Sequence, residues 1–146
     1  PWLNAAPPRL NDYWLTMRKL ISILMLATMA GAANAEWIKT VSNDDLDIYV
    51  DPSTVHRAGN KAKVWELYNF DSSQEANGKR YLSLKIQNEY DCKEPRLRSL
   101  AGVGYARKMG EGEVRFTDND PDKWAPVVPG TMGESIWKLI CGERQS

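Results

Sequence analysis

The two cysteines of this chain, Cys92 and Cys141, are the residues whose type and position most directly indicate chemistry. Together with the single histidine, His56, they do not complete a tetrahedral zinc site, and we predict neither a metal nor a cofactor. Cys92 ends a segment of alternating apolar residues, and Cys141 ends a predicted amphipathic helix. If the helix covers that apolar face, an oxidising compartment favours a Cys92–Cys141 disulfide. Two free, buried thiols are the alternative.

A series of basic residues that follows Cys92 could bind an anionic partner. These residues are Arg96, Arg98, Arg107 and Lys108, and arginine is favoured at binding hot spots. The alternative is that they form only the solvated face of a strand. We take them as candidates for partner binding. On that hypothesis, replacing Arg96 and Arg98 with alanine weakens binding without lowering thermal stability.

The remaining polar residues do not form a pattern that a catalytic site needs. His56 lies beside a predicted turn, and the nucleophile motif G-x-S-x-G is absent from the sequence. Neighbouring carboxylates such as Asp44 and Asp45 are expected in solvated turns. The acidic segment 118–122 lacks the glycine and the terminal glutamate of a calcium loop. We therefore predict that the protein is not an enzyme.

The segment Met17–Ala35 has the three-part layout of a secretory signal peptide. Arg18 and Lys19 precede an apolar run, Leu20–Ala30, and Ala33-Asn34-Ala35 supplies small residues for cleavage. A membrane anchor or a buried helix is the alternative, but a spanning helix needs roughly 20 apolar residues. The sequence therefore predicts export and cleavage after Ala35.

The predicted signal peptide divides the chain into three parts. Residues 1–16 are expected to be an upstream leader outside the native protein, residues 17–35 the signal peptide, and residues 36–146 a single domain. Of the 19 basic and 19 acidic residues, three basic and one acidic precede residue 36, which leaves 16 and 18 in the domain. This near balance argues against a nucleic-acid partner. Once processed, the protein is expected not to be integral to a membrane.

Most of the predicted domain has the period-two pattern of strands. A polar loop over Asp71–Lys79 is expected to join two long strands as a hairpin, and Ser53–Arg57 could form one helical turn. The expected strands are Trp37–Val41, Leu46–Val50, Lys61–Phe70, Tyr81–Cys92, Arg96–Met109 and Glu113–Thr117.

The end of the chain changes to a helical period. Thr131-Met132-Gly133-Glu134 has the form of a capping box, and Gly142 follows the last apolar position. Trp65, Trp124 and Trp137 are expected to pack in the core or between sheet and helix. The predicted fold is α+β, an antiparallel sheet of about six strands with a C-terminal helix packed on one face and tied to it by the disulfide.

A series of short motifs spread over nearly the whole predicted domain resembles the surface-adhesin protein E family, small exported proteins of Gram-negative bacteria. The combination of Tyr90-Asp91-Cys92 with a terminal Trp-x-x-x-Cys is its most specific part. In chain order, the motifs are Tyr49–Val55, Lys63-Val64-Trp65, Tyr90-Asp91-Cys92 followed by Arg96 and Arg98, Trp124, Val127–Thr131 and Trp137–Cys141.

The resemblance implies a largely antiparallel sheet with a C-terminal helix tied to it by the cysteine pair, and a non-enzymatic role, with the namesake members acting at the cell surface on host molecules. We therefore expect a binding domain, periplasmic or at the cell surface, whose partner is a host or envelope protein. Where surface members can carry a lipid-attachment cysteine after the signal, this sequence has Glu36. A periplasmic envelope protein with a structural or stress-related role is the alternative function, and a small periplasmic enzyme or inhibitor is a third. Exposed sheet edges would also allow a homodimer.

Overall fold

The computed structural model of the chain describes residues 35–142. The expectations for residues 1–34, the leader and nearly all of the signal peptide, lie outside the described residues. Within the described part, no helix has the length and apolar character needed to cross a membrane.

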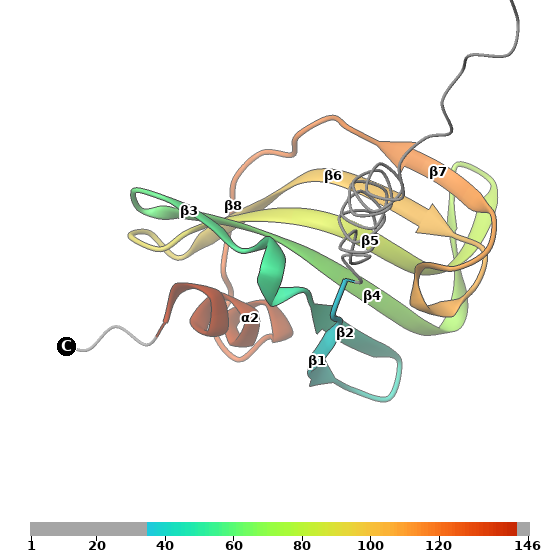
Figure 1. Cartoon of the computed structure of the whole chain (residues 1–146), viewed down its shortest axis with the longest axis horizontal. Helices are drawn as coiled ribbons and strands as arrows, with labels where there is room; N and C mark the ends of the chain where they lie inside the picture. Colours follow the sequence, from blue (N-terminus) through green and yellow to red (C-terminus); the bar gives the residue numbers. More distant parts are fainter. Residues whose placement is uncertain (1–34, 143–146) are drawn as a thin grey trace, which may run out of the picture. The chain divides into compact units, whose positions relative to one another are not determined.

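Eight strands within residues 35–142 form one antiparallel sheet (Figure 1). Six of them follow the order β1-β2-β4-β5-β6-β7, while β3 pairs with β4 and β8 pairs with β6. The predicted fold class is confirmed, and the two short strands β3 and β8 account for the difference from about six strands. The strands are β1 Ile38–Ser42, β2 Leu46–Val50, β3 His56–Ala58, β4 Lys61–Ala76, β5 Lys79–Asp91, β6 Arg96–Tyr105, β7 Val114–Asp118 and β8 Ala125–Pro126.

The predicted hairpin loop over Asp71–Lys79 is wrong in extent. Strand β4 continues to Ala76, and the turn consists of Asn77 and Gly78 alone, with φ angles of 51° and 72°. Both positive angles suit a two-residue hairpin turn, for which Asn-Gly is a favoured sequence. The residues before the turn are polar because this end of the hairpin is largely exposed, and a register shift after Asn69 accommodates the extra length.

Two smaller expectations also change. The predicted helical turn is a 3₁₀ turn, η2, over Pro52–Thr54, because Asp51 caps it and the chain then forms β3. Strand β6 ends at Tyr105 rather than at Met109, because the chain turns into a second 3₁₀ segment, η3, over Lys108–Gly110.

The C-terminal helix α2, Met132–Cys141, begins and ends where the sequence predicts. The Thr131 side chain accepts a hydrogen bond from the backbone N–H of Glu134, which satisfies one free donor of the first turn. Ile136, Trp137 and Ile140 are buried on one side of α2. They form a single hydrophobic core with residues of β2, β4 and β5, namely Ile48, Val50, Ala62, Val64 and Tyr90, and with Val127.

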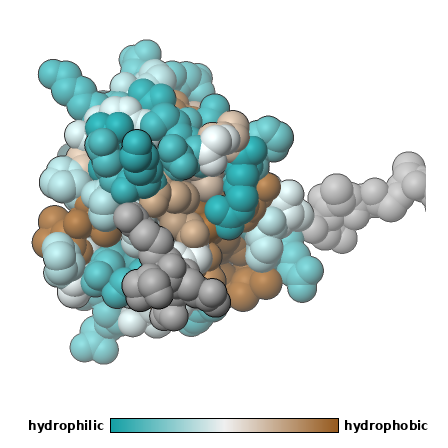
Figure 2. Space-filling model, turned by 90° about the vertical axis from the view of Figure 1, so that its left-hand side faces the viewer, coloured by the Kyte–Doolittle hydropathy of each residue, from teal (hydrophilic) through white to brown (hydrophobic). Residues whose placement is uncertain are grey.

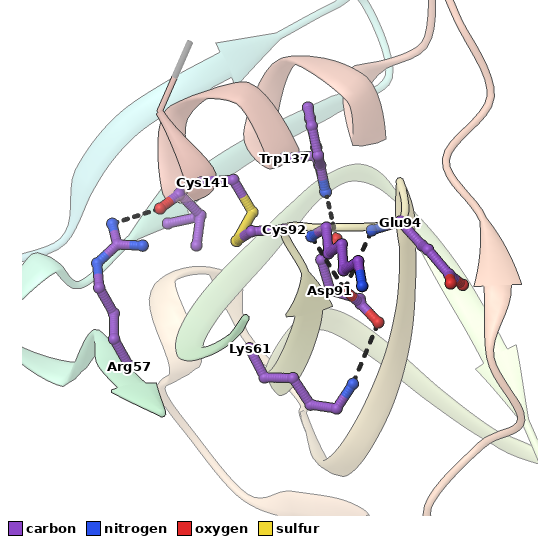
Figure 3. Close-up of a disulfide and its surroundings, with 9 residues drawn as sticks. Arg57, Lys61, Asp91, Cys92, Glu94, Trp137 and Cys141 are labelled. Carbon is purple, nitrogen blue, oxygen red and sulfur yellow. Dashed lines mark hydrogen bonds and ion pairs between the residues drawn. A yellow bond between two sulfur atoms is a disulfide. The ribbon is translucent and has the colours of Figure 1, made fainter. Parts of the chain in front are cut away.

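A disulfide between Cys92 and Cys141 ties the end of α2 to the end of β5, as predicted (Figure 3). The two Cα atoms are 5.3 Å apart. On one side of the bond, the Trp137 indole N–H donates to the backbone carbonyl of Asp91. On the other, the Arg57 guanidinium donates to the backbone carbonyl of Ile140. The helix is therefore held by a covalent bond, by its apolar side and by hydrogen bonds that include these two and one from the Asn43 amide to the Met132 sulfur.

Candidate functional site

Trp124 lies at the end of the sheet where β8 pairs with the start of β6. Arg96 is opposite Pro126 and Leu97 is opposite Ala125 in this short pairing, so Trp124 lies close to β6. Its ring is half-buried and does not belong to the hydrophobic core, contrary to the expectation of core packing. The residues on both sides of it in the sequence are exposed, and the ring is contacted by side chains from β4 and β6 instead.

Three cations surround the Trp124 ring. The guanidinium carbon of Arg98 lies 4.6 Å from the ring centroid, and that of Arg96 lies 4.9 Å from it. The Lys61 ammonium lies 4.6 Å from the same centroid. A cation within about 6 Å of an indole face is attracted by the ring quadrupole, so these contacts orient all three side chains.

Two buried carboxylates hold the same three cations. Asp91 forms an ion pair of 2.9 Å with Arg96 and another of 3.1 Å with Lys61 (Figure 3 shows the one with Lys61). Glu89 forms an ion pair of 2.6 Å with Arg98. The register explains the pairing, since Asp91 is opposite both Lys61 and Arg96, and Glu89 is opposite Arg98. Directly opposite residues share a face of an antiparallel sheet.

The Trp124 cluster places its three cations nearer to solvent than its two buried carboxylates. We use this name for Lys61, Glu89, Asp91, Arg96, Arg98 and Trp124. Asp91 and Glu89 are 4% and 5% exposed, whereas the side chains of the three cations are partly exposed. Arg96 also forms an ion pair of 3.4 Å with the exposed Glu94, so three carboxylates balance the three cations, and only Glu89 and Asp91 among them are buried.

The Asp91 carboxylate is stabilised in its charged form. The backbone N–H of Glu94, followed by the Arg96 and Lys61 side chains and the backbone N–H of Lys93, holds the pKa of Asp91 well below its ordinary value. The ionised carboxylate accepts from the turn after β5 and from two side chains at once. It therefore fixes the position of the cations relative to Trp124.

Of the four basic residues predicted to bind a partner, the structure brings only Arg96 and Arg98 together. Arg107 and Lys108 follow the far end of β6, and the seven strand residues Ser99–Tyr105, at about 3.3 Å each, lie between Arg98 and Arg107. Lys108 forms an exposed ion pair of 2.8 Å with Asp71 instead. These two residues therefore belong to another part of the surface.

Sequence reasoning missed the centre of the cluster. The residues not predicted as part of a site are Trp124, Lys61, Glu89 and Asp91. One signal was available, because Glu89 and Asp91 alternate with the apolar residues of β5 and must share a face with whatever lies opposite. The pairing of β8 with β6 is long-range, and the sequence does not indicate it.

Polar groups elsewhere in the described residues do not converge in the same way. His56 is exposed on β3. Across residues 35–142, no group of three or more His, Cys, Asp or Glu side chains is placed to hold a metal ion. The Trp124 cluster combines an aromatic ring with fixed donors, and tryptophan and arginine are side chains enriched at binding hot spots.

Comparisons with known proteins agree with this architecture. Residues 37–142 match the family described as surface-adhesin protein E. Among curated proteins, no match is found.

Solved structures of Haemophilus influenzae protein E are similar in fold. Crystal form II has 15% sequence identity and a TM-score of 0.58, and the alignment covers 75% of this chain and 89% of that one. The selenomethionine form has 14% identity and a TM-score of 0.57, covering 76% of this chain and 89% of that one. Protein E from non-typeable Haemophilus influenzae has 14% identity and a TM-score of 0.56, covering 76% of this chain and 78% of that one.

Proposed function

The chain belongs to the surface-adhesin protein E family, and we propose that it is an exported, non-enzymatic domain that binds a protein ligand at the cell envelope. In this proposal the domain is displayed at the cell surface and its ligand is a host protein; an envelope protein bound in the periplasm is the alternative. Family membership supports the adhesin-like role. The segment Met17–Ala35 supports export, because its composition is that of a secretory signal.

The single observation that carries the proposal is the Trp124 cluster. Tryptophan and arginine are the side chains most enriched at binding hot spots. Here an indole is ringed by two guanidinium groups and one ammonium, each held in place by a buried carboxylate. Side chains that are already ordered lose less conformational entropy when a partner binds. The cluster is therefore pre-organised to contact an acidic or aromatic surface.

The proposed binding surface includes Arg96 and Arg98 but not the distant Arg107 and Lys108. The latter pair remains a separate candidate, since an exposed lysine paired with an exposed aspartate is readily released to another partner. We place the main contact at Trp124 because, within residues 35–142, its ring is contacted by three cations, whereas Lys39 alone contacts Tyr49 and Lys85 alone contacts Trp37 and Tyr105.

The test is binding of the purified exported protein to an array of host extracellular-matrix and plasma proteins and to solubilised envelope proteins. Trp124→Ala should weaken saturable binding about tenfold or more, as expected for a hot spot. Trp124→Phe keeps an apolar ring under the cations and serves as a check on folding.

Lys39→Ala is the matched control. Lys39 pairs with Asp47 at 2.8 Å and lies 5.6 Å from the Tyr49 ring, so it has the same kinds of partner at another part of the sheet. Its substitution should leave binding unchanged. If Trp124→Ala and Lys39→Ala bind every array protein as tightly as the wild type does, the Trp124 cluster is not the binding surface.

A further inference from the structure

A second feature of the described residues is an apolar groove of about 230 Å³ beside the C-terminal end of α2. Its floor includes Val50 and Ile140, which are 2% and 3% exposed. Two of its lining residues, Ile38 and Leu139, are large apolar side chains that are 47% and 55% exposed. The other lining residues are Thr40, Pro52, Val55 and Arg57.

Exposed apolar side chains gathered around a groove mark a binding site more often than isolated ones do. Figure 2 views the molecule from the side on which α2 and β3 lie in Figure 1, and it shows apolar side chains from the centre of this face toward its lower right, with hydrophilic ones above them. A ligand in the groove would remove the side chains of Ile38 and Leu139 from water.

The groove has few polar groups, and one of them is a cation. The Thr40 hydroxyl already donates to the backbone carbonyl of Ile48. Arg57 is exposed and uses one donor on the backbone carbonyl of Ile140, and a guanidinium has five N–H donors in all. The groove therefore offers an apolar wall and a positive charge beside it, which complements a hydrocarbon chain with an anionic end.

A peptide fits this groove less well than a hydrocarbon chain does. Each peptide residue brings a backbone donor and acceptor that need partners. The adjacent strand β1 ends the sheet order among the described residues, but its pairing with β2 shifts register between Lys39 and Val41. Such a bulge bends an edge strand and interrupts the regular ladder that an added peptide strand would need.

We propose that this groove binds a free fatty acid, with the alkyl chain against Val50, Leu139 and Ile140 and the carboxylate paired with Arg57. The volume is below the 300–1,000 Å³ typical of sites for drug-sized ligands, so it suits part of one linear chain. Fatty acid binding is separate from the Trp124 cluster and does not depend on protein binding there.

The proposal predicts a chain-length dependence. Each CH₂ group that leaves water should tighten binding about fourfold for as long as the chain stays within the groove. Octanoate, decanoate and dodecanoate should therefore bind in that order of increasing affinity.

The experiment titrates dodecanoate, below its critical micelle concentration, into the purified exported protein with ¹³C-labelled methyl groups. The methyl signals of Ile38, Leu139 and Ile140 should shift and saturate together. Leu139→Gln, on the exposed rim, should weaken binding about fivefold or more. Val114→Gln is the matched control, because Val114 is 50% exposed and lies on β7, at the other end of the sheet order.

Arg57→Gln separates the two parts of the ligand. It should weaken dodecanoate about tenfold, as expected for loss of a charge-assisted hydrogen bond, and should leave uncharged 1-dodecanol unaffected. Because Arg57 also contacts Ile140, the Leu139 variant tests the same groove without that contact.

Three outcomes would overturn the proposal. The first is the absence of saturable methyl shifts at the groove, and the second is equal weakening by Leu139→Gln and Val114→Gln. The third is binding to phosphatidylglycerol vesicles, or to an apolar peptide, with none to monomeric dodecanoate, which would assign the groove to a membrane surface or to a protein.

Discussion

The indole N–H of Trp137 donates a hydrogen bond of 3.0 Å to the backbone carbonyl of Asp91, the residue that precedes Cys92. The same short segment thus holds α2 through a hydrogen bond and, one residue later, through the Cys92–Cys141 disulfide. The side chain of Asp91 faces the other way and fixes Lys61 and Arg96 of the Trp124 cluster. Residues 91–92 therefore connect the support of the helix to the candidate binding surface.

Removing the disulfide should lower stability markedly. The bond joins residues separated by 49 positions, and the chain-entropy estimate for such a loop is about 4 kcal/mol. Cys141→Ser, and the double variant Cys92→Ser/Cys141→Ser, should lower the free energy of unfolding by about 2–4 kcal/mol in urea titrations under oxidising conditions. Reduced wild-type protein should unfold at the midpoint of the double variant. A wild-type midpoint that reductant leaves unchanged would contradict the prediction.

The buried carboxyl of Glu66 should make stability fall as pH rises. Burial raises the pKa of Glu66 above its ordinary value of 4.5, and the Tyr90 hydroxyl donates to one of its oxygens. Its second oxygen, Oε2, has no hydrogen-bond partner among the described residues. Between the unfolded and folded pKa values the fold retains a proton that the unfolded chain releases, so stability declines by up to about 1.4 kcal/mol per pH unit.

Glu66→Gln tests this interpretation, because the amide resembles the protonated carboxyl in shape but does not titrate in this range. We expect its stability, measured by urea unfolding between pH 4 and 8, to lose the downward slope that wild type shows. Tyr90→Phe removes a donor that favours the ionised carboxylate, which raises the pKa of Glu66 further, so the decline should continue to higher pH. Parallel curves for wild type and Glu66→Gln would show that Glu66 does not titrate differently in the two states.

Arg98→Ala should lower stability as well as binding. From the sequence, replacing Arg96 and Arg98 with alanine was expected to leave thermal stability unchanged. The ion pair of 2.6 Å between Arg98 and the buried Glu89 changes that expectation. Breaking a fully buried pair costs 3–5 kcal/mol, and because Arg98 is partly exposed we expect about 1–2 kcal/mol. A double-mutant cycle with Glu89→Gln measures the coupling. Additive effects of the two single variants would indicate that the pair contributes nothing to the fold.

Two glycines of β6 should differ in their tolerance of alanine. A Cβ at Gly104 would overlap the ring of Phe116, whereas one at Gly102 would meet Leu84 at 3.5 Å, an ordinary contact. We expect Gly104→Ala to lower the free energy of unfolding by about 1–3 kcal/mol, as overpacking does, and Gly102→Ala to have little effect. Equal melting temperatures for the two variants would mean that Phe116 moves aside freely.

Local sequence signals predicted much of the fold. The capping box at Thr131 and the glycine after Cys141 gave both ends of α2, and the alternation before Cys92 placed its thiol under that helix. The turn at Asn77-Gly78 was recognised, but the polar residues before it were mistaken for a loop. Polarity reports exposure, and an exposed strand end is as polar as a loop.

The candidate site was less predictable because it depends on long-range pairing. Arg96 and Arg98 were expected to bind a partner, yet the ring that orients them is brought to β6 only by the short strand β8. The burial of Glu66 could not be predicted from the sequence for the same reason. A charged residue in a central strand indicates burial only once the helix that covers its face is known, and the partner that satisfies it, Tyr90, lies on another strand.

The most direct test of the central claim, that this domain acts as an adhesin at the cell surface, is its accessibility on intact cells. Cells that make the protein are treated with protease, with and without opening of the outer membrane, and residues 36–146 are detected with an antibody. The account predicts that the signal disappears from intact cells. Protection until the outer membrane is opened would contradict surface display and would favour a role inside the envelope.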